Sequence, residues 1–89
     1  MDFPFEQKVE GNKIVRFFDP NIDTEELVWH RDLKDRKVKI IESGNWKFQE
    51  DNELPVDLYP NQEIWIQKSS WHRVIRGDNK LVIEIEEFN

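Results

Sequence analysis

Two histidines and one aspartate have the chemical types and the spacing to bind a metal ion together. One residue separates His30 from Asp32, so in an extended segment both side chains point to the same side, and His72 follows much later in the chain. Two imidazoles and one carboxylate with open coordination positions suit Fe(II), and also Mn, Ni or Zn. The sequence therefore predicts a site for one divalent ion at His30, Asp32 and His72. Asp35 is a further candidate ligand, in a turn or facing outward.

Arg36 gives the same residues a second interpretation, in which no metal is bound. A guanidinium about 4 Å from a divalent cation costs several kcal/mol at an effective dielectric constant near 20. Asp32 and Arg36 could instead form a bidentate ion pair, and His30 and His72 would hydrogen-bond this pair or an anionic ligand. We expect a small ligand, an anion or a carboxylate, in a pocket, and a metal ion is the alternative.

The elements that must position these side chains are short strands. Apolar and polar residues alternate with period two, whereas a helical pattern is limited to one turn within Asn21 to Glu26. Turn residues punctuate the chain, and Ser43-Gly44-Asn45 predicts a hairpin between its flanking strands. The expected strands are 13–18, 27–32, 37–42, 46–49, 56–59, 63–67, 71–76 and 80–87. About eight short strands at close spacing predict one all-β sandwich or small barrel, with residues 1–89 as a single domain.

The alternation also predicts which side chains face inward. Placing the apolar residues of each strand inside gives a core of Val38, Ile40, Trp46, Phe48, Ile64, Ile66, Leu81, Ile83 and Ile85. If Val28 points inward, His30 and Asp32 point inward as well. By the same alternation His72 shares its side with Val74, and Arg36 with Val38. A buried polar group without a partner costs about 1–3 kcal/mol, so these four imply a network, a metal or a wet pocket. Trp46 and Phe48 would line this pocket, although a core position is the simpler interpretation of both.

The same parity leaves an apolar set on the outer faces. Its members are Trp29, Ile41, Trp65, Ile75 and Val82. A grouped set with large aromatic rings is typical of a partner surface, so we expect a homodimer. The alternative is that some of these side chains pack under the N-terminal segment from Phe3 to Phe18.

Composition excludes several function classes. Basic residues are scattered through a chain with a net charge of -6, which disfavours nucleic-acid binding. No apolar stretch of about 18 residues predicts a membrane span. The first residues lack the basic and apolar regions of a signal peptide, and the chain has no cysteine. We therefore expect a cytoplasmic protein.

Two segments resemble the conserved motifs of the cupin superfamily. The first motif of that family has a His-x-His pair, a Glu and a strand that ends on Gly; the second has a Gly turn, a strand, Pro-x-Gly and a His. The corresponding segments here are Trp29-His30-Arg31-Asp32 with Arg36 to Gly44, and Pro60 to Val74. The resemblance covers about two thirds of the chain and implies a jelly-roll barrel, the double-stranded β-helix of cupins.

The departures from these motifs bear on the site. His30 and His72 match the first and the last family ligands, whereas Asp32 stands in place of the second His and Arg36 in place of the Glu. The resemblance implies either a metal-binding cupin, an oxygenase or isomerase type among them, or a metal-free binding or structural cupin. A third implication is a metal-free acid–base enzyme, since some cupin-fold sugar epimerases use a His and an Asp. The sequence leaves open whether the protein is an enzyme.

Overall fold

Eight short strands and one turn of 3-10 helix make up the architecture. The computed structural model describes residues 5–21, 23 and 25–88. The elements are β1 (Phe5–Glu10), β2 (Lys13–Phe18), η1 (Glu25–Leu27), β3 (Asp35–Glu42), β4 (Lys47–Glu50), β5 (Val56–Asp57), β6 (Glu63–Ile66), β7 (His72–Ile75) and β8 (Leu81–Phe88). No helix among the described residues has the length and the apolar character needed to cross a membrane.

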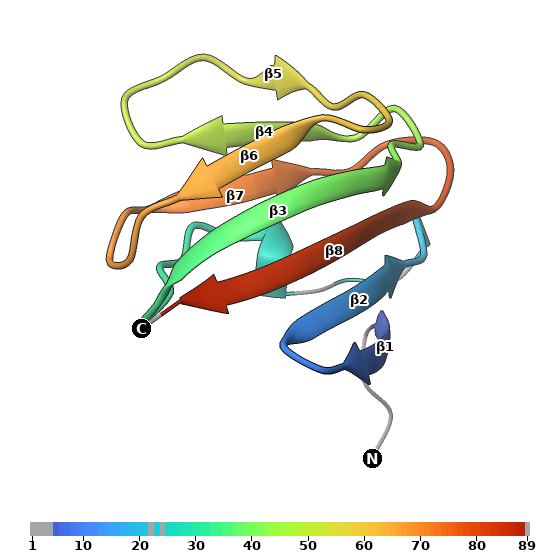
Figure 1. Cartoon of the computed structure of the whole chain (residues 1–89). Coiled ribbons are helices and arrows are strands. Elements are labelled where there is room, and N and C mark those ends of the chain that lie inside the picture. The colour runs from blue at the N-terminus through green and yellow to red at the C-terminus, as the bar shows by residue number, and fades with distance from the viewer. Residues whose placement is uncertain (1–4, 22, 24, 89) are drawn as a thin grey trace.

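The strands form two antiparallel sheets (Figure 1). Five strands make one sheet in the order β1-β2-β8-β3-β6, and three make the other in the order β5-β4-β7. The sheets face each other, and η1 contacts β7. After β3 the chain crosses to the smaller sheet for β4 and β5, and from β5 onward consecutive strands alternate between the sheets, which is the connectivity of a jelly roll.

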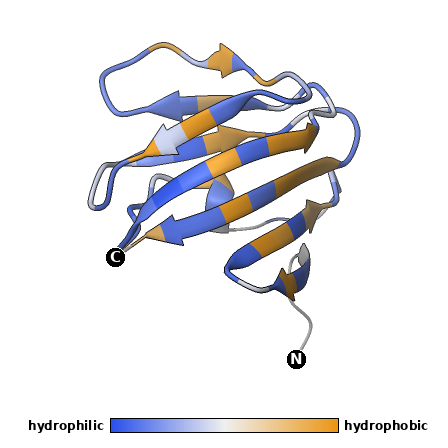
Figure 2. Ribbon diagram, viewed as in Figure 1, coloured by the Kyte–Doolittle hydropathy of each residue, from blue (hydrophilic) through white to orange (hydrophobic). Residues whose placement is uncertain are grey.

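The core lies between the two sheets and follows the predicted alternation. Figure 2 shows apolar and polar residues alternating along β3 and β8. The buried apolar side chains come from five strands and two connecting segments: Phe18, Val38, Ile40, Trp46, Phe48, Leu58, Ile66, Leu81, Val82 and Ile85. Ile64, Val74 and Ile83 pack against them and are partly buried. All nine residues of the predicted core are therefore buried or partly buried in the core.

Three predictions about the elements are wrong. Residues 27–32 do not form a strand, because η1 ends at Leu27 and only His30 makes a β-bridge. The turn at Gly44 does not close a hairpin, since β3 and β4 belong to different sheets. Val82 is buried, although its parity is outward; its cross-strand neighbours Phe17 and Glu42 flank it on the same face of the sheet. The pattern also missed β1, which pairs with β2.

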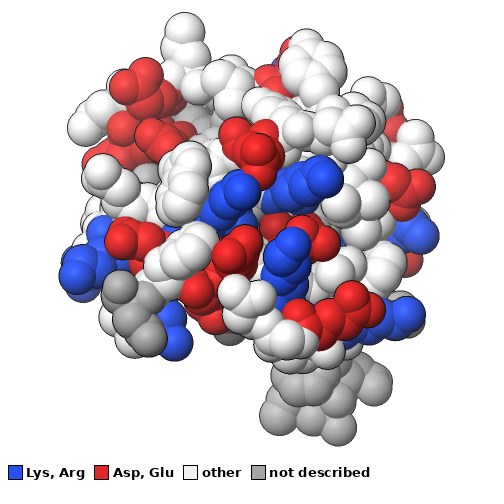
Figure 3. Space-filling model, viewed as in Figure 1, with Lys and Arg blue, Asp and Glu red and all other residues white. Residues whose placement is uncertain are grey.

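The outer face of the larger sheet carries interleaved charges (Figure 3). Lysines on β2 and β3 alternate there with glutamates on β6 and β8, as the mixed blue and red surface shows. Lys37 lies 2.8 Å from Glu63, and Lys13 lies 3.5 Å from Glu84. Opposite charges across neighbouring strands stabilise the strand pairing modestly, and positive and negative side chains are mixed on this face.

Two turns that carry the chain between the sheets pack against each other. The Gly44 carbonyl accepts hydrogen bonds from the backbone N–H groups of Asp78 and Asn79, at 3.0 and 3.1 Å. A Cβ added at Gly77 would lie 2.2 Å from the Gly44 oxygen and 2.5 Å from a backbone carbon of Asn45. Both turns therefore need glycine for close approach of backbone to backbone.

We expect Gly77→Ala to lower the free energy of unfolding by about 3 kcal/mol, because backbone on both sides of the new methyl must move. Gly11→Ala is the matched control, since nothing lies within 4 Å of its Cβ position. Gly11 has a φ of 62°, so its variant should lose only about 1 kcal/mol. Urea denaturation of both variants checks this, and equal losses would contradict the close approach of the turns.

Candidate functional site

Glu26, His30 and His72 bring three side chains of metal-ligand type together. One potential ligand atom from each residue lies within 4.8 Å of the others. Glu26 is carried by η1, and His72 begins β7. His30 is held to His72 by an antiparallel bridge whose two backbone hydrogen bonds have N···O distances of 3.0 and 2.9 Å. A short helix and one isolated bridge thus position the cluster, with no long element involved.

Backbone carbonyls fix the orientation of both imidazoles. Nδ1 of His30 lies 2.8 Å from the Val28 carbonyl oxygen, and Nδ1 of His72 lies 3.0 Å from that of Ser70. A carbonyl only accepts, so Nδ1 carries the proton and Nε2 of each neutral ring keeps its lone pair. Histidines that bind metals are commonly held in this way, with the distal nitrogen left for the ion.

The free ends of the two imidazoles each face a carboxylate. Nε2 of His30 lies 2.8 Å from Oε2 of Glu26, and Nε2 of His72 lies 3.2 Å from Oδ2 of Asp32. These distances are short, but within the described residues the buried atoms His30 Nε2 and Asp32 Oδ2 make no hydrogen bond of acceptable direction. Of these four residues, Glu26, His30 and His72 form the convergent set of ligand atoms, and Asp32 lies outside it.

Two arginines stand behind this cluster, and each contacts a carboxylate. Nη1 of Arg36 lies 3.3 Å from Oδ1 of Asp32, and its Nε lies 3.1 Å from Oε2 of Glu87. Nη1 of Arg16 lies 3.4 Å from Oε1 of Glu26. The predicted ion pair between Asp32 and Arg36 is therefore present, through a single contact. Three carboxylates against two guanidinium groups leave one net negative charge among these five side chains.

Burial and pairing act in opposite directions on the pKa values of the cluster. Burial alone would lower the pKa of His30, but the adjacent Glu26 carboxylate and the Val28 carbonyl raise it above its usual value. Burial alone would raise the pKa of Glu26, but His30 beside it makes the net shift downward. The pKa of Asp32 is likewise lowered, because His72 and the Arg36 charge outweigh its burial. The pairing of these groups thus shifts all three pKa values toward the charged forms.

These shifts predict how stability depends on pH in the presence of a chelator. The lowered pKa values of Glu26 and Asp32 add stability above about pH 4, which is lost as the pH falls through the folded values. The raised pKa of His30 adds stability below about pH 6.5, which is lost as the pH rises through its folded value. We expect urea midpoints to decline above about pH 6.5 in the wild type and to decline less in His30→Gln. Parallel curves for the two proteins would contradict the pairing of His30 with Glu26.

A small cavity lies behind the cluster, between the two sheets. Glu26, His72 and the two arginines border it, and the rest is lined by Leu58 and by apolar side chains from five strands, β3, β4, β6, β7 and β8. Its volume is about 40 Å³, which is room for one or two waters at about 30 Å³ each. The Phe48 ring lines it 5.8 Å from the His72 ring. A carboxylate ligand of several heavy atoms would have to bind at the mouth of this cavity.

The structure brings together most of the predicted site residues. His30, Asp32, Arg36, His72 and Phe48 all border or face the same region. Trp46 is not among the residues that line the cavity: it is fully buried, donates to the Asn79 carbonyl at 2.6 Å and packs on Phe18.

The structure differs from the sequence-based expectations at Val28 and Asp35. Val28 is 60% exposed, so it does not carry His30 inward as the alternation required. The bridge to His72 turns His30 inward instead. Asp35 lies apart from the site, where its Oδ1 accepts a hydrogen bond from the Lys68 backbone N–H.

Sequence reasoning missed Glu26 of the cluster and two charged residues beside it, Arg16 and Glu87. Glu26 stands four residues before His30, a spacing that brings it onto the imidazole once η1 turns the chain. Arg16 shares a face with Phe18 in β2, and Glu87 shares a face with Ile85 in β8. Parity in these two strands signals both inward positions.

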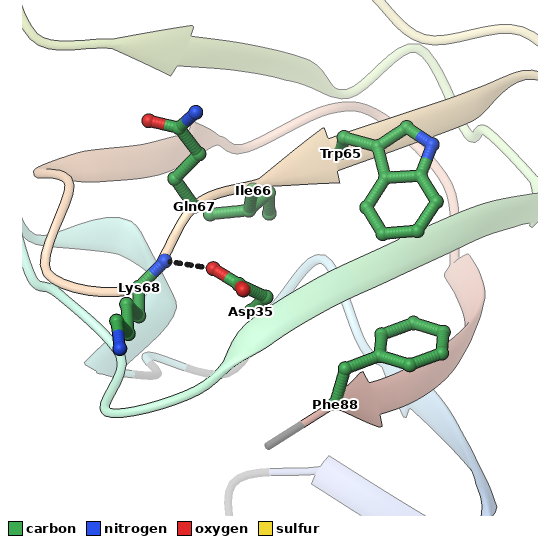
Figure 4. A pocket seen from close by; sticks show the side chains of 6 residues that line it. All are labelled: Asp35, Trp65, Ile66, Gln67, Lys68 and Phe88. Atoms are coloured by element: carbon green, nitrogen blue, oxygen red, sulfur yellow. Dashed lines mark hydrogen bonds between the residues drawn. The ribbon is translucent and has the colours of Figure 1, made fainter.

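A larger and more open groove of about 550 Å³ lies on the outside, where β6 and β8 end (Figure 4). The Trp65 and Phe88 rings line it with their centroids 5.5 Å apart, and Trp65 is 61% exposed.

The five residues of the expected dimer surface divide between the two sheets: Ile41, Trp65 and Val82 belong to the larger one, and Trp29 and Ile75 lie at β7. The homodimer stays a prediction.

Solved structures share this architecture at low sequence identity. No protein-family model and no curated protein matches the sequence. A cupin domain from Bordetella pertussis aligns over 100% of this chain and 99% of its own, with a TM-score of 0.67 and 20% identity. A cupin-2 domain protein from Shewanella frigidimarina aligns over 99% and 85%, with a TM-score of 0.67 and 15% identity. Structures of DMSP lyases give a TM-score of 0.72 at 18% identity over 86% of this chain, which spans only 37% of the lyase chain.

Proposed function

We propose that this chain, which has the cupin fold, binds one divalent metal ion between Glu26, His30 and His72. The observation that carries the proposal is the convergence of three ligand atoms within 4.8 Å, with both Nδ1 atoms bound to backbone carbonyls. Two imidazoles and one carboxylate suit Fe, Mn, Ni or Zn. An ion held there would act as a Lewis acid toward a small ligand at its open positions.

The charges around the cluster support a cation better than an anion. Arg36 was the reason to expect an anionic ligand, but its guanidinium contacts Asp32 and Glu87. An arriving carboxylate would compete with these two side chains, whereas a divalent ion meets a net negative surrounding. Asp32 faces His72 with Oδ2, so it can orient this imidazole or approach the ion itself.

The anion-binding hypothesis stays as the second candidate, because two guanidinium groups border the cavity. Acetate is a suitable probe for it. If the mouth of the cavity binds carboxylates, acetate raises the unfolding temperature by the linkage relation, and Arg36→Met abolishes the rise. If the metal proposal holds, divalent ions raise the unfolding temperature and acetate does not.

A matched pair of amide variants separates the two carboxylates. We expect Glu26→Gln to weaken Co(II) binding by about tenfold or more, because the neutral amide oxygen is a poorer ligand. Asp32→Asn removes the same charge from a residue outside the three-ligand set, and its loss should be clearly smaller. Calorimetric titration of both variants measures this. A larger loss in Asp32→Asn would assign the carboxylate ligand to Asp32, as the sequence suggested.

A further inference from the structure

We propose that two arginine–tryptophan pairs on the outer surface hold the His30 segment against β7 and so position both imidazoles for the metal. The positioning role rests on the proposed metal site. The residues are Trp29 and Arg31 on one segment and Trp71 and Arg73 on the other. None of them lies in the cluster itself, and each is a sequence neighbour of a histidine.

The bridge between His30 and His72 places these four residues opposite one another. In an antiparallel bridge the residue before one partner faces the residue after the other, so Trp29 lies across from Arg73 and Arg31 from Trp71. Successive side chains alternate sides, so the flanking residues point away from the imidazoles.

The contacts agree with this arrangement on both sides of the bridge. The Arg73 guanidinium lies 4.8 Å from the centre of the Trp29 ring, and that of Arg31 lies 5.2 Å from the Trp71 ring. On the inner side, the two imidazole rings are 4.3 Å apart, edge to face. One bridged residue pair thus carries two cation–π contacts outside and the predicted metal ligands inside.

The His30 segment depends on these contacts because, apart from the ionic contacts of His30 and Asp32, few interactions among the described residues secure it. Between the end of η1 and the start of β3 it forms no strand, and Val28 and Leu33 are 60% and 91% exposed. Its backbone bonds to the β7 side are the two of the bridge and one from the Ser69 N–H to the Asp32 carbonyl. By contrast, β7 is paired along its length with β4.

Arg73 is itself anchored, which makes it a fixed point for Trp29. Its Nε donates to Oε1 of Gln49 on β4 at 2.9 Å, and the two residues are cross-strand partners. The row Gln49, Arg73, Trp29 therefore links the smaller sheet to the His30 segment. Outer partners that orient a metal ligand typically change affinity about 10- to 100-fold when removed.

The two arginine–tryptophan pairs act as a clamp on the His30–His72 bridge, and hydrogen exchange tests this clamp without any metal. In the presence of a chelator, the double variant Arg31→Met/Arg73→Met should exchange the His30 and His72 amide protons about tenfold faster, because the bridge opens more often. Amides of the core pair Val38 and Ile85 serve as the internal reference. Lys80→Met is the control variant, since it removes a cation 5.8 Å from the Phe17 ring, away from the bridge.

Co(II) titration tests the positioning role. The double variant should bind Co(II) about tenfold more weakly, Arg73→Lys should keep most of the affinity that Arg73→Met loses, and Lys80→Met should match the wild type. Unchanged exchange in the double variant overturns the clamp. Faster exchange with unchanged Co(II) affinity overturns the positioning role. A wild type that binds no Co(II) refutes the proposed function and the positioning role together, whereas exchange still decides the clamp.

Discussion

His72→Ala is expected to lower the affinity for divalent ions at least 100-fold, the largest effect of any site substitution. His72 is the most buried member of the cluster, with 3% of its surface exposed, so its removal leaves a gap in the most enclosed part of the ligand set. The variant removes one of three ligands, a larger change than the 10- to 100-fold loss typical of an outer partner. Titration of Co(II) into wild type and variant measures the difference.

Folding must be controlled in this experiment, because His72 also packs in the molecule. Its ring touches His30 and Phe48, and it faces Asp32, so its removal should cost about 2 kcal/mol of stability. His30→Ala is the second variant, since the His30 side chain is 19% exposed and its loss leaves a smaller void. A folded His72→Ala protein that binds Co(II) as the wild type does would exclude His72 as a ligand.

Trp46→Ala is expected to lower the free energy of unfolding by about 3–5 kcal/mol, which is a large part of the total for a chain of this size. Trp46 is completely buried and packs on Phe18. Its indole N–H donates to the Asn79 carbonyl, which joins the core to the turn before β8. Chemical denaturation followed by circular dichroism measures the loss.

Trp46→Phe separates the two contributions of this side chain. It keeps most of the apolar volume and removes the indole donor, so we expect a loss of about 1–2 kcal/mol. Neither variant should change Co(II) affinity while the protein stays folded, because Trp46 does not line the cavity. A specific loss of metal binding in Trp46→Phe would return this residue to the pocket, where the sequence had placed it.

Alternation was sufficient to predict the all-β fold and most of the core. It succeeded in β3, β6 and β8 because each strand has one face in the core and one in water, so hydrophobic parity identifies the sides. It failed at Val82 of β8, because the side chains of its cross-strand neighbours, Phe17 and Glu42, flank it on the outer face. It also failed at Gly44, because a turn sequence does not say whether the chain stays in its sheet.

The candidate site was predicted through its histidines, and for a reason that was partly wrong. The parity argument needed a strand at residues 27–32, but a single bridge to His72 orients His30. Glu26 could not be found by strand alternation, since it lies on a helical turn whose direction depends on tertiary contacts. Arg36 was identified correctly as an inward residue, but its second partner, Glu87, comes from β8 and needs the three-dimensional register.

Titration of Co(II) into the wild-type chain, prepared without a histidine tag and stripped with a chelator, shows whether Glu26, His30 and His72 bind a metal ion. We expect saturable binding of one ion per chain, with a visible spectrum typical of nitrogen and oxygen ligands and with loss of binding in His72→Ala. Binding that does not saturate, or that is the same in His72→Ala, would contradict a metal site at Glu26, His30 and His72.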